Sequence, residues 1–313
     1  MTAAPRRRRH DPLAPTGSGR VEPPAPSTID LHTHTTRSDG VVAPAELVRQ
    51  VADAGVRLLA VTDHDTLAGY REVIAADAIP PGLTLIPGVE INAIVTRDLG
   101  LWEGELHILG FGMDPDDEAF EAAMSAQRGR RRDRFARTVA KLREVGLPID
   151  AQVAGVTPSD EDAMGRPTIA RALIAAGFAV SVEDAFQRLI GYGCPGYVPR
   201  EGLGPTEAID AINASGGIAV LAHFAEAPTR RELLGELVES GLAGLEVYYR
   251  SFGRLTVELV GNVARDLGLL ATGGTDYHGD LGSYAESHAM LWVPPEVGPR
   301  LEDALRSRSA PRP

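Results

Sequence analysis

Cysteine, lysine and long apolar runs are all scarce in this sequence. Cys194 is the only cysteine among the 313 residues, which excludes an internal disulfide and a cysteine-based zinc site and indicates a reducing cytoplasm. Lys141 is the only lysine, so the other positions counted as lysine or arginine are all arginine. The longest apolar runs fall well short of the roughly 18 residues that a membrane-spanning helix needs, so we expect no association with a membrane.

An excess of positive charge is missing as well. The formal net charge is −12, so the chain as a whole repels nucleic acid. A polyanionic substrate would therefore need a local cationic site. The composition, 43% hydrophobic and 24% charged, is ordinary for a globular protein and allows one large core with a smaller appendage. Nothing in it indicates an obligate protein partner.

Both ends of the chain lack a pattern that would pack. Arg6 to Arg9 are followed by several prolines, and no apolar stretch follows the arginines, so this is not a secretory signal. We expect residues 1–27 and 307–313 to be disordered tails. Contact between the basic tail and nucleic acid is an alternative, but a solvated extension is the favoured interpretation.

Between the tails, short apolar runs rich in β-branched residues predict strands. They are Thr28–Leu31, Leu58–Thr62, Leu83–Ile91, Glu105–Phe111, Gly217–Ala222, Gly244–Tyr248, Leu269–Thr272 and Ala289–Val293. Several are followed by helical patterns that stop at a glycine, the residue that best tolerates the left-handed position after a helix. These helices are Pro44–Ala54, Thr206–Ser215, Arg230–Ser240 and Leu255–Leu267. The alternation predicts an α/β fold with a parallel sheet or barrel.

The alternation stops between Gly112 and Gly204. A long helical pattern begins near Asp114 and is stopped by Gly146 and Pro148. Two further helices are expected, at Thr168–Ala176 and Val182–Ile190. We therefore predict a barrel formed by residues 28–112 and 205–306, with residues 113–204 as a helical insertion that covers the substrate.

Six of the eight histidines lie at or just beyond predicted strand ends, with carboxylates nearby. The histidines are His32, His34, His64, His107, His223 and His278, and the carboxylates are Asp39, Asp63, Asp65, Glu90 and Asp276. In a barrel of parallel strands the carboxyl ends meet on one face, so these residues can converge there. A lone buried histidine is more often a core residue than a ligand, but the set as a whole predicts a metal site.

The spacing of these residues suits metal ligation. His32 and His34 are two residues apart, so on a strand they point the same way and can grip one ion, and Asp276 and His278 repeat the arrangement. Imidazole combined with carboxylate suits Zn, Mn, Fe or Co and excludes a purely oxygen-ligated Ca or Mg site. The number of such ligands exceeds what one ion accepts, which indicates more than one metal.

As an ordered set, these motifs resemble the polymerase and histidinol phosphatase (PHP) family. They are Asp30-Leu-His-Thr-His34, Ser38-Asp39-Gly40, Thr62-Asp-His-Asp65, Pro87-Gly-Val-Glu90, His107, His223 and Thr275-Asp-Tyr-His-Gly279. The resemblance covers nearly the whole chain from Thr28 onward. It implies a distorted seven-stranded (β/α) barrel, similar to a TIM barrel, with a helical insertion. It also implies three divalent metal ions, manganese foremost, with zinc or iron as alternatives.

The resemblance implies three ligand sets, carried over by position. The first set is His32, His34, Glu90 and Asp276; the second is Glu90, His107 and His223; the third is Asp39, His64 and His278. Asp63 and Asp65 would orient the ligands or handle protons. The implied reaction is phosphate ester hydrolysis by a metal-bound hydroxide, which requires neither a Ser-His-Asp triad nor a cysteine nucleophile.

The insertion is expected to select the substrate. Its first helix is rich in arginine, and we expect Arg131, Arg134 and Arg200 to bind a second phosphate; a solvated helix face is the alternative for the group. Gly165-Arg-Pro167 and Tyr197-Val-Pro-Arg200 resemble the branch of nucleoside 3′,5′-bisphosphate phosphatases and 5′→3′ exonucleases on short RNA. Thr168 and Phe224 depart from that branch, which usually has histidine and proline there; neither is an expected metal ligand, so the departures leave the activity in place and the exact substrate open.

Three other functions compete with this interpretation. A histidinol-phosphate phosphatase is a sister activity within the family, and the arginine-rich insertion favours a nucleotide over it. An amidohydrolase often bridges two metals with a carboxylated lysine at a strand end, whereas Lys141 lies in a helical pattern. A non-catalytic nucleic-acid-binding protein is disfavoured by the charge of −12 and by the complete ligand set.

Overall fold

The computed structural model describes residues 26–95, 104–155 and 165–309. Seven strands form one sheet in the order of the sequence, from β1 to β7. They are β1 (Ile29–Asp30), β2 (Leu58–Val61), β3 (Thr84–Val95), β4 (Gly104–Phe111), β5 (Ile218–Leu221), β6 (Gly244–Tyr249) and β7 (Leu270–Gly274). The sequence-based prediction of a distorted seven-stranded α/β barrel is confirmed.

The two edge strands lie against each other, so the sheet nearly closes. The backbone N–H of Leu31 donates to the carbonyl of Gly273 over 3.1 Å, and Thr33 forms a parallel bridge with Tyr277. Strands such as β2 and β5 are short, apolar and buried at every residue, which is typical of parallel strands covered on both faces.

The prediction of a parallel sheet is wrong for strand β4. It runs antiparallel to both neighbours, so that Asn92 of β3 lies opposite His107 of β4. The link of residues 96–103 is shorter than the dozen or so residues that a parallel crossover needs. The predicted third strand ends at Ile91, whereas β3 continues to Val95. The predicted link to the next strand was therefore long enough for a parallel crossover, and the link in the structure is not. His107 therefore lies in the middle of its strand and not at the strand end.

The barrel is surrounded by helices. These are α1 (Pro44–Asp53), α2 (Ala68–Ala75), α7 (Pro205–Ala214), α8 (Arg231–Glu239), α9 (Arg254–Asp266), α10 (Tyr284–His288) and α11 (Val297–Ser309), with a 3-10 turn at Ala227–Thr229. The four predicted barrel helices are confirmed, and each is followed by a glycine with positive φ. Those glycines are Gly55, Gly216, Gly241 and Gly268.

Three sequence-based boundaries differ from the structure. Ala289–Val293 forms no strand, because the chain passes from α10 into an irregular segment whose buried side chains include Leu291 and Val293. Helix α11 continues to Ser309, beyond the expected start of the tail at residue 307. Ser27, placed in the N-terminal tail, is buried, and its carbonyl oxygen lies 2.8 Å from Nε2 of His288. Residues 1–25 of that tail lie outside the described part.

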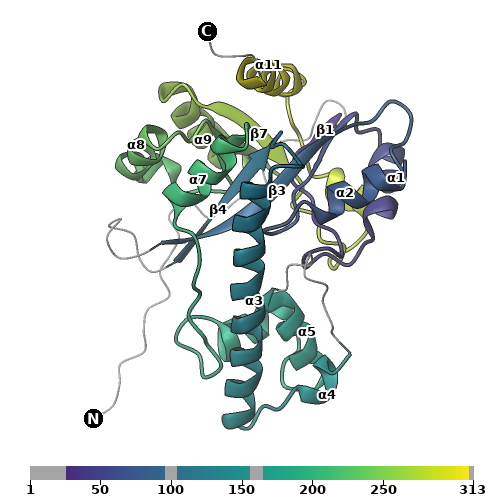
Figure 1. Cartoon of the computed structure of the whole chain (residues 1–313), viewed down its shortest axis with the longest axis vertical. Coiled ribbons are helices and arrows are strands. Elements are labelled where there is room, and N and C mark those ends of the chain that lie inside the picture. The colour runs from purple at the N-terminus through teal and green to yellow at the C-terminus, as the bar shows by residue number, and fades with distance from the viewer. Residues whose placement is uncertain (1–25, 96–103, 156–164, 310–313) are drawn as a thin grey trace.

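Between β4 and α7 the described residues form helices. They are α3 (Glu118–Glu144), α4 (Asp150–Val153), α5 (Arg166–Ala175), α6 (Val182–Ala185) and a π-helix, η2 (Phe186–Ile190). Asp117, the residue before helix α3, caps the helix, because its carboxylate accepts the N–H groups of Ala119 and Phe120. At 1.5 Å per residue it is about 40 Å long, and Figure 1 shows it leading away from the barrel with α4 and α5 beside its far half.

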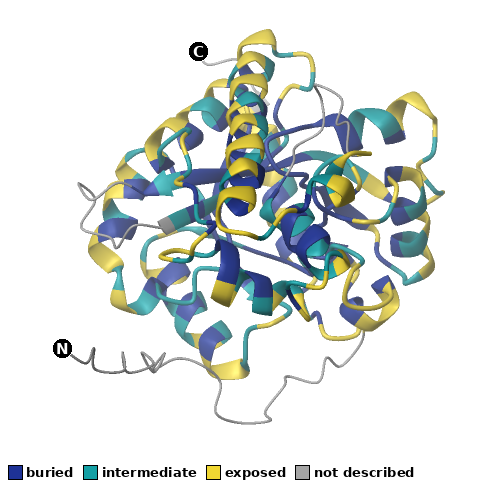
Figure 2. Ribbon diagram, turned by 90° about the horizontal axis from the view of Figure 1, so that it is seen from below, coloured by how far each residue is buried: buried dark blue, intermediate teal, exposed yellow. Residues whose placement is uncertain are grey.

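We call these helices, α3 to η2, the helical layer. Phe120 and Met124, near the start of α3, pack in the barrel core, whereas Val139 and Leu142 pack with α5 and η2 in a separate hydrophobic cluster. Buried residues gather at the barrel and on the inward faces of the helices (Figure 2). No helix among the described residues is long and apolar enough to cross a membrane.

Candidate metal centre and substrate pocket

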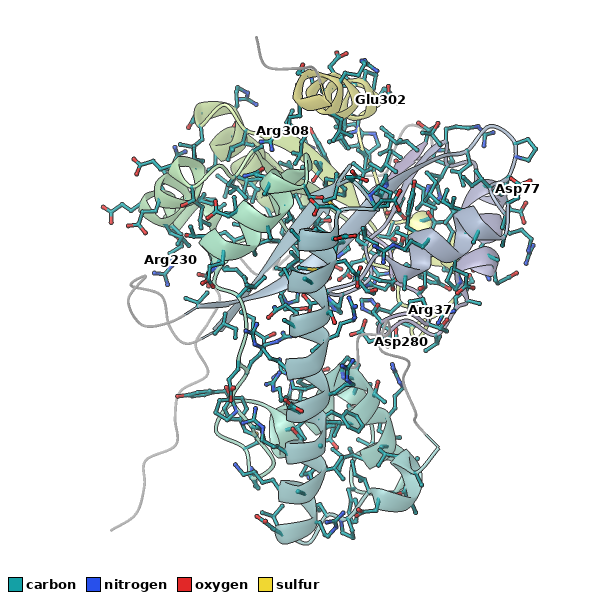
Figure 3. The ribbon with its side chains drawn as sticks, in the orientation of Figure 1. Arg37, Asp77, Arg230, Asp280, Glu302 and Arg308 are labelled. Atoms are coloured by element: carbon teal, nitrogen blue, oxygen red, sulfur yellow. The ribbon has the colours of Figure 1, made fainter. Side chains whose placement is uncertain are left out.

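The predicted site residues gather at the edge of the barrel that faces the helical layer. His32, His34 and Asp39 follow β1, His64 follows β2, His223 follows β5, and Asp276 and His278 follow β7, while Glu90 and His107 lie within β3 and β4. Figure 3 shows Arg37 and Asp280, from the segments after β1 and β7, at this edge. Antiparallel pairing brings His107 to this edge, because it lies opposite Asn92 of β3, two residues after Glu90.

The nine predicted ligands form three groups whose candidate ligand atoms lie within 4.8 Å of one another. The groups are His32, His34, Glu90 and Asp276; then Glu90, His107 and His223; then His34, Asp39, His64 and His278. They match the three expected sets, with His34 added to the third. Asp276 and His278 fall into different groups, so their spacing does not repeat the pairing of His32 with His34.

Glu90 lies at the centre of the three groups. Its Oε2 is 3.1 Å from Nε2 of His34 and 3.1 Å from Nδ1 of His64. Its Oε1 is 2.6 Å from Nδ1 of His107 and 3.4 Å from Nε2 of His223. Nε2 of His32 also lies 3.3 Å from Oε2, so this one carboxylate faces five imidazoles and would be able to hold more than one cation.

The chemistry of the donors fits divalent metal ions. Among the described residues, His32 Nε2, His34 Nε2, His64 Nδ1 and Asp39 Oδ1 are buried without a hydrogen-bond partner. Unsatisfied buried polar atoms are rare in folded proteins and call for a specific explanation. Nitrogen and carboxylate oxygen atoms that converge in this way suit Zn, Mn, Fe or Co.

Burial and charge act against each other on the histidines. Burial lowers the pKa of His64 well below its ordinary value despite the nearby carboxylates of Asp39 and Glu90. Burial also lowers the pKa of His278, but Asp39 and Asp276 outweigh it and raise the pKa to about 10. Burial raises the pKa of the Asp276 carboxyl, but His32, His278 and His34 outweigh it and hold that pKa well below its ordinary value, so this carboxylate is ionised.

Two buried carboxylates that sequence reasoning did not assign to the site support the ligands. Glu246 places Oε1 3.0 Å from Nδ1 of His32, and its Oε2 accepts the backbone N–H of His223 over 2.7 Å. Asp30 accepts the N–H of Thr275, the residue before Asp276, over 2.9 Å. A lone glutamate in the otherwise uncharged strand β6 was the available signal for Glu246.

Asp63 and Asp65 have different surroundings. Asp63 accepts hydrogen bonds from the N–H and hydroxyl of Thr35 and from the hydroxyl of Ser38, so it fixes the loop between His34 and Asp39. These contacts favour orientation of ligands over proton transfer. Asp65 Oδ2 accepts from Nε of Arg131 over 2.5 Å, while its Oδ1 is buried without a partner among the described residues.

Strained backbone marks the same region. Four described residues other than glycine have positive φ, and three of them belong to the site: Asp65 at 50°, His223 at 31° and Asp276 at 50°. The left-handed region is costly for side chains with a Cβ and tends to occur where surrounding contacts enforce it, often at functional sites. Here the strained residues are ones whose side chains lie at the candidate metal centre or beside it.

A cavity of about 180 Å³ adjoins the ligand groups. It is lined by Asp39, His64, Asn92, Glu105, His107, Arg131, Arg134, Phe135, Thr138, Gly165, Arg166, Pro167, Ile169, Phe186 and Arg200. All three predicted arginines, Arg131, Arg134 and Arg200, are among them, together with Arg166. We call this cavity the arginine pocket. Sequence reasoning missed Arg166 and Glu105, although Gly165-Arg-Pro167 had been noted as a motif.

Each arginine of the pocket has a protein partner. Arg131 binds Asp65 and the Asn92 side chain. Arg134 Nε donates to the carbonyl of Val198 over 3.0 Å. Glu105 accepts from Arg200 over 2.6 Å and from Arg166 over 3.1 Å, and it lies 3.7 Å from Arg134. Protein groups therefore hold every arginine of the pocket in place.

The only lysine is far from the ligand groups in this arrangement. Lys141 lies near the end of α3 and donates to the carbonyl of Tyr197 over 2.6 Å. It therefore cannot bridge the metals in the manner of an amidohydrolase.

Comparison with known proteins agrees with the geometry. A PHP domain model matches residues 30–159. A 5′-3′ exoribonuclease of Haemophilus influenzae is 33% identical over 80% of this chain and 89% of its own length. A 3′,5′-nucleoside bisphosphate phosphatase of Chromobacterium violaceum is 30% identical over 80% and 87%.

Solved structures extend the likeness to three dimensions. A Bifidobacterium adolescentis protein, provisionally described as a metal-dependent phosphoesterase, superposes with a TM-score of 0.74 at 32% identity, over 90% of this chain and 98% of that one. The sequence identity, the coverage and the clustered ligands all agree. The chain belongs to the PHP family of metal-dependent phosphoesterases.

Proposed function

We propose that this phosphoesterase hydrolyses a phosphate of a nucleoside 3′,5′-bisphosphate or at the 5′ end of a short RNA. The observation that carries the proposal is the arginine pocket, because it shares Asp39, His64 and His107 with the ligand groups. A substrate with two phosphates would place one at the metals and the other among the arginines. The names of the relatives, an exoribonuclease and a bisphosphate phosphatase, support the same substrate class.

We further propose that the three ligand groups hold three divalent ions, manganese in the first instance. Such ions neutralise phosphoryl oxygens and lower the pKa of bound water toward neutrality. The protein's own contribution is positional. Glu246 and Asp63 fix the ligands, and Asp65, paired with Arg131, joins the ligand loop after β2 to helix α3.

The helical layer is proposed to cover the substrate. It supplies Arg131 and Arg134 from α3 and Arg166 and Ile169 from α5, while Phe186 comes from η2. Guanidinium groups suit phosphate, and the apolar side chains Phe135, Ile169 and Phe186 offer a surface for a nucleobase. This mixture favours a nucleotide over histidinol phosphate.

The test is release of phosphate from adenosine 3′,5′-bisphosphate with added manganese, with and without a chelator. A 5′-phosphorylated oligoribonucleotide and histidinol phosphate serve as parallel substrates. Chelator-sensitive turnover of the bisphosphate or the RNA is expected. Turnover of histidinol phosphate alone, or none of the three by metal-loaded protein, would overturn the proposed substrate class.

A further inference from the structure

The arginine pocket contains a carboxylate that belongs to none of the three ligand groups. Asp39 and Glu105 are the acidic residues that line it, and Asp39 is one of the candidate ligands. Glu105 lies in β4, and its two oxygen atoms take different partners. Oε2 accepts from Arg200 over 2.6 Å and Oε1 accepts from Arg166 over 3.1 Å. Glu105 therefore occupies the place of an anion bound by guanidinium groups.

The arginines around Glu105 repel one another. Burial and the neighbouring guanidinium groups lower the pKa of Arg134 and of Arg200 to about 10 each. Cations packed so closely need an anion among them, because like charges a few ångströms apart in a partly buried site are unfavourable. Glu105 supplies that anion.

Two of these arginines also have anchors that do not involve Glu105. Arg134 donates from Nε to the carbonyl of Val198, and the guanidinium of Arg166 lies over the ring of Phe186, 5.1 Å from its centroid. Arg131, the fourth arginine of the pocket, is held by Asp65 and Asn92. Loss of the negative charge of Glu105 would therefore leave most of the pocket in place.

We propose that Glu105 is the internal counter-ion of the arginine pocket and sets its affinity for a second phosphate. A phosphate entering the pocket takes over guanidinium partners of Glu105, so the carboxylate competes with the ligand. The inference rests on the proposed function, since it concerns the second phosphate of that substrate. It assigns Glu105 a role in specificity, because a substrate with a single phosphate, placed at the metals, does not meet this competition.

The experiment compares Glu105→Gln with the unaltered full chain. Binding of non-hydrolysable phosphonate analogues of adenosine 3′,5′-bisphosphate and of adenosine 5′-monophosphate is measured by calorimetry on the manganese-loaded chain, so that one phosphate is placed at the metals and hydrolysis does not interfere. Glu105→Gln should lower the Kd of the bisphosphate about tenfold, equivalent to about 1.4 kcal/mol. The Kd of the monophosphate should stay within about twofold. With manganese, KM of the two hydrolysable parent compounds should follow the same pattern.

Two further variants separate charge from shape. Glu105→Asp keeps the charge and should not tighten bisphosphate binding. Glu201→Gln neutralises an exposed carboxylate that pairs with Arg137, a residue of α3 that does not line the pocket. It should change the Kd of neither compound. Thermal unfolding of each variant checks that it is folded.

Unchanged or weaker bisphosphate binding in folded Glu105→Gln would overturn the inference. So would an equal change for the monophosphate, which would indicate that Glu105 acts through His107, 3.9 Å away. Absence of bisphosphate binding in the unaltered chain would overturn it too. By contrast, failure of the metal-loaded chain to hydrolyse the bisphosphate, with the binding differences intact, would count against the proposed function alone.

Discussion

At the scale of single residues, Glu246 connects two histidines that are far apart in the sequence. One oxygen faces the ring of His32 and the other accepts the backbone N–H of His223, and the side chain is fully buried. A carboxylate that binds the second nitrogen of a ligating imidazole fixes its tautomer and orientation. The two ligand groups that contain these histidines therefore depend on one carboxylate.

Glu246→Gln should weaken metal binding about 10- to 100-fold, as is typical when such a partner of a ligand is lost. The amide can still accept from His32, but its NH2 group cannot accept the N–H of His223. Manganese titration of phosphatase activity measures the effect, and activity should return at high manganese. Glu239→Gln, an exposed position on α8, is the matched control. An unchanged manganese midpoint would contradict the role.

Arg134→Ala should mainly impair substrates with two phosphates. Hydrogen bonds to charged groups contribute about 1.5–3 kcal/mol, so KM for adenosine 3′,5′-bisphosphate should rise about 10- to 100-fold. An aryl phosphate, which does not reach the pocket, should be hydrolysed nearly as before. Arg130→Ala, an exposed position on the same helix, serves as the control. Equal loss on both substrates would show that Arg134 is structural.

The nine candidate ligands can be proposed from the sequence, whereas the residues that support them cannot, for a physical reason. The ligands lie in short motifs whose internal spacing and order can be read along the chain. Glu246 and His32 are 214 positions apart, and Glu105 meets Arg200 across 95 positions, so these contacts exist only after the barrel has formed. The divergence of Asp276 and His278 likewise follows from the positive φ of Asp276, which no local pattern announced.

At the scale of elements, the fold was predicted where apolar runs were bounded by glycine and missed where strand direction mattered. Helices α1 and α9 were predicted correctly, because Gly55 and Gly268 follow them and mark where they stop. The direction of strand β4 was missed, because an apolar alternation does not reveal whether a strand runs parallel or antiparallel. Its reversal also explains why His107 reaches the site from mid-strand.

Helix α3 is attached to the barrel by a buried ion pair. Arg131 and Asp65 are nearly inaccessible to solvent, and Arg128 of the same helix donates to the carbonyl of Asp65 over 3.0 Å. Removing one partner of such a pair leaves a buried charge without compensation. The attachment thus contributes to stability as well as to the position of the pocket.

Arg131→Leu should lower the free energy of unfolding by about 3–5 kcal/mol, because it leaves the Asp65 carboxylate buried and unpaired. Urea unfolding followed by circular dichroism measures it. The matched control is Arg137→Leu, which breaks an exposed pair on the same helix and should cost about 0–1 kcal/mol. A loss for Arg131→Leu no larger than that of the control would contradict the role of the pair.

At the scale of the whole molecule, the ligand groups join segments from both halves of the chain. The first group joins residues that follow β1 and β7 to one in β3, and the second joins residues in β3 and β4 to one that follows β5. The third joins residues that follow β1, β2 and β7. A bound cation would therefore hold together parts of the barrel that are distant in sequence. The stability of the fold should therefore depend on bound metal.

Removal of metal should lower the melting temperature. A ligand present at 100 times its Kd stabilises the folded state by about 2.7 kcal/mol per site. Scanning calorimetry of chelator-treated protein, before and after manganese is restored, measures the change, and magnesium in place of manganese should restore less. Identical melting temperatures with and without manganese would argue against the proposed metal sites.

The separate hydrophobic cluster of the helical layer has a consequence for how this enzyme can change over time. Its residues, such as Leu142, Ile169 and Leu173, are not shared with the clusters that support the strands. Substitutions within this cluster therefore leave the clusters that support the strands unchanged. Because the layer is proposed to cover the substrate, changes confined to this cluster would alter recognition while the metal-binding residues are preserved, which makes the cluster a suitable target for directed evolution.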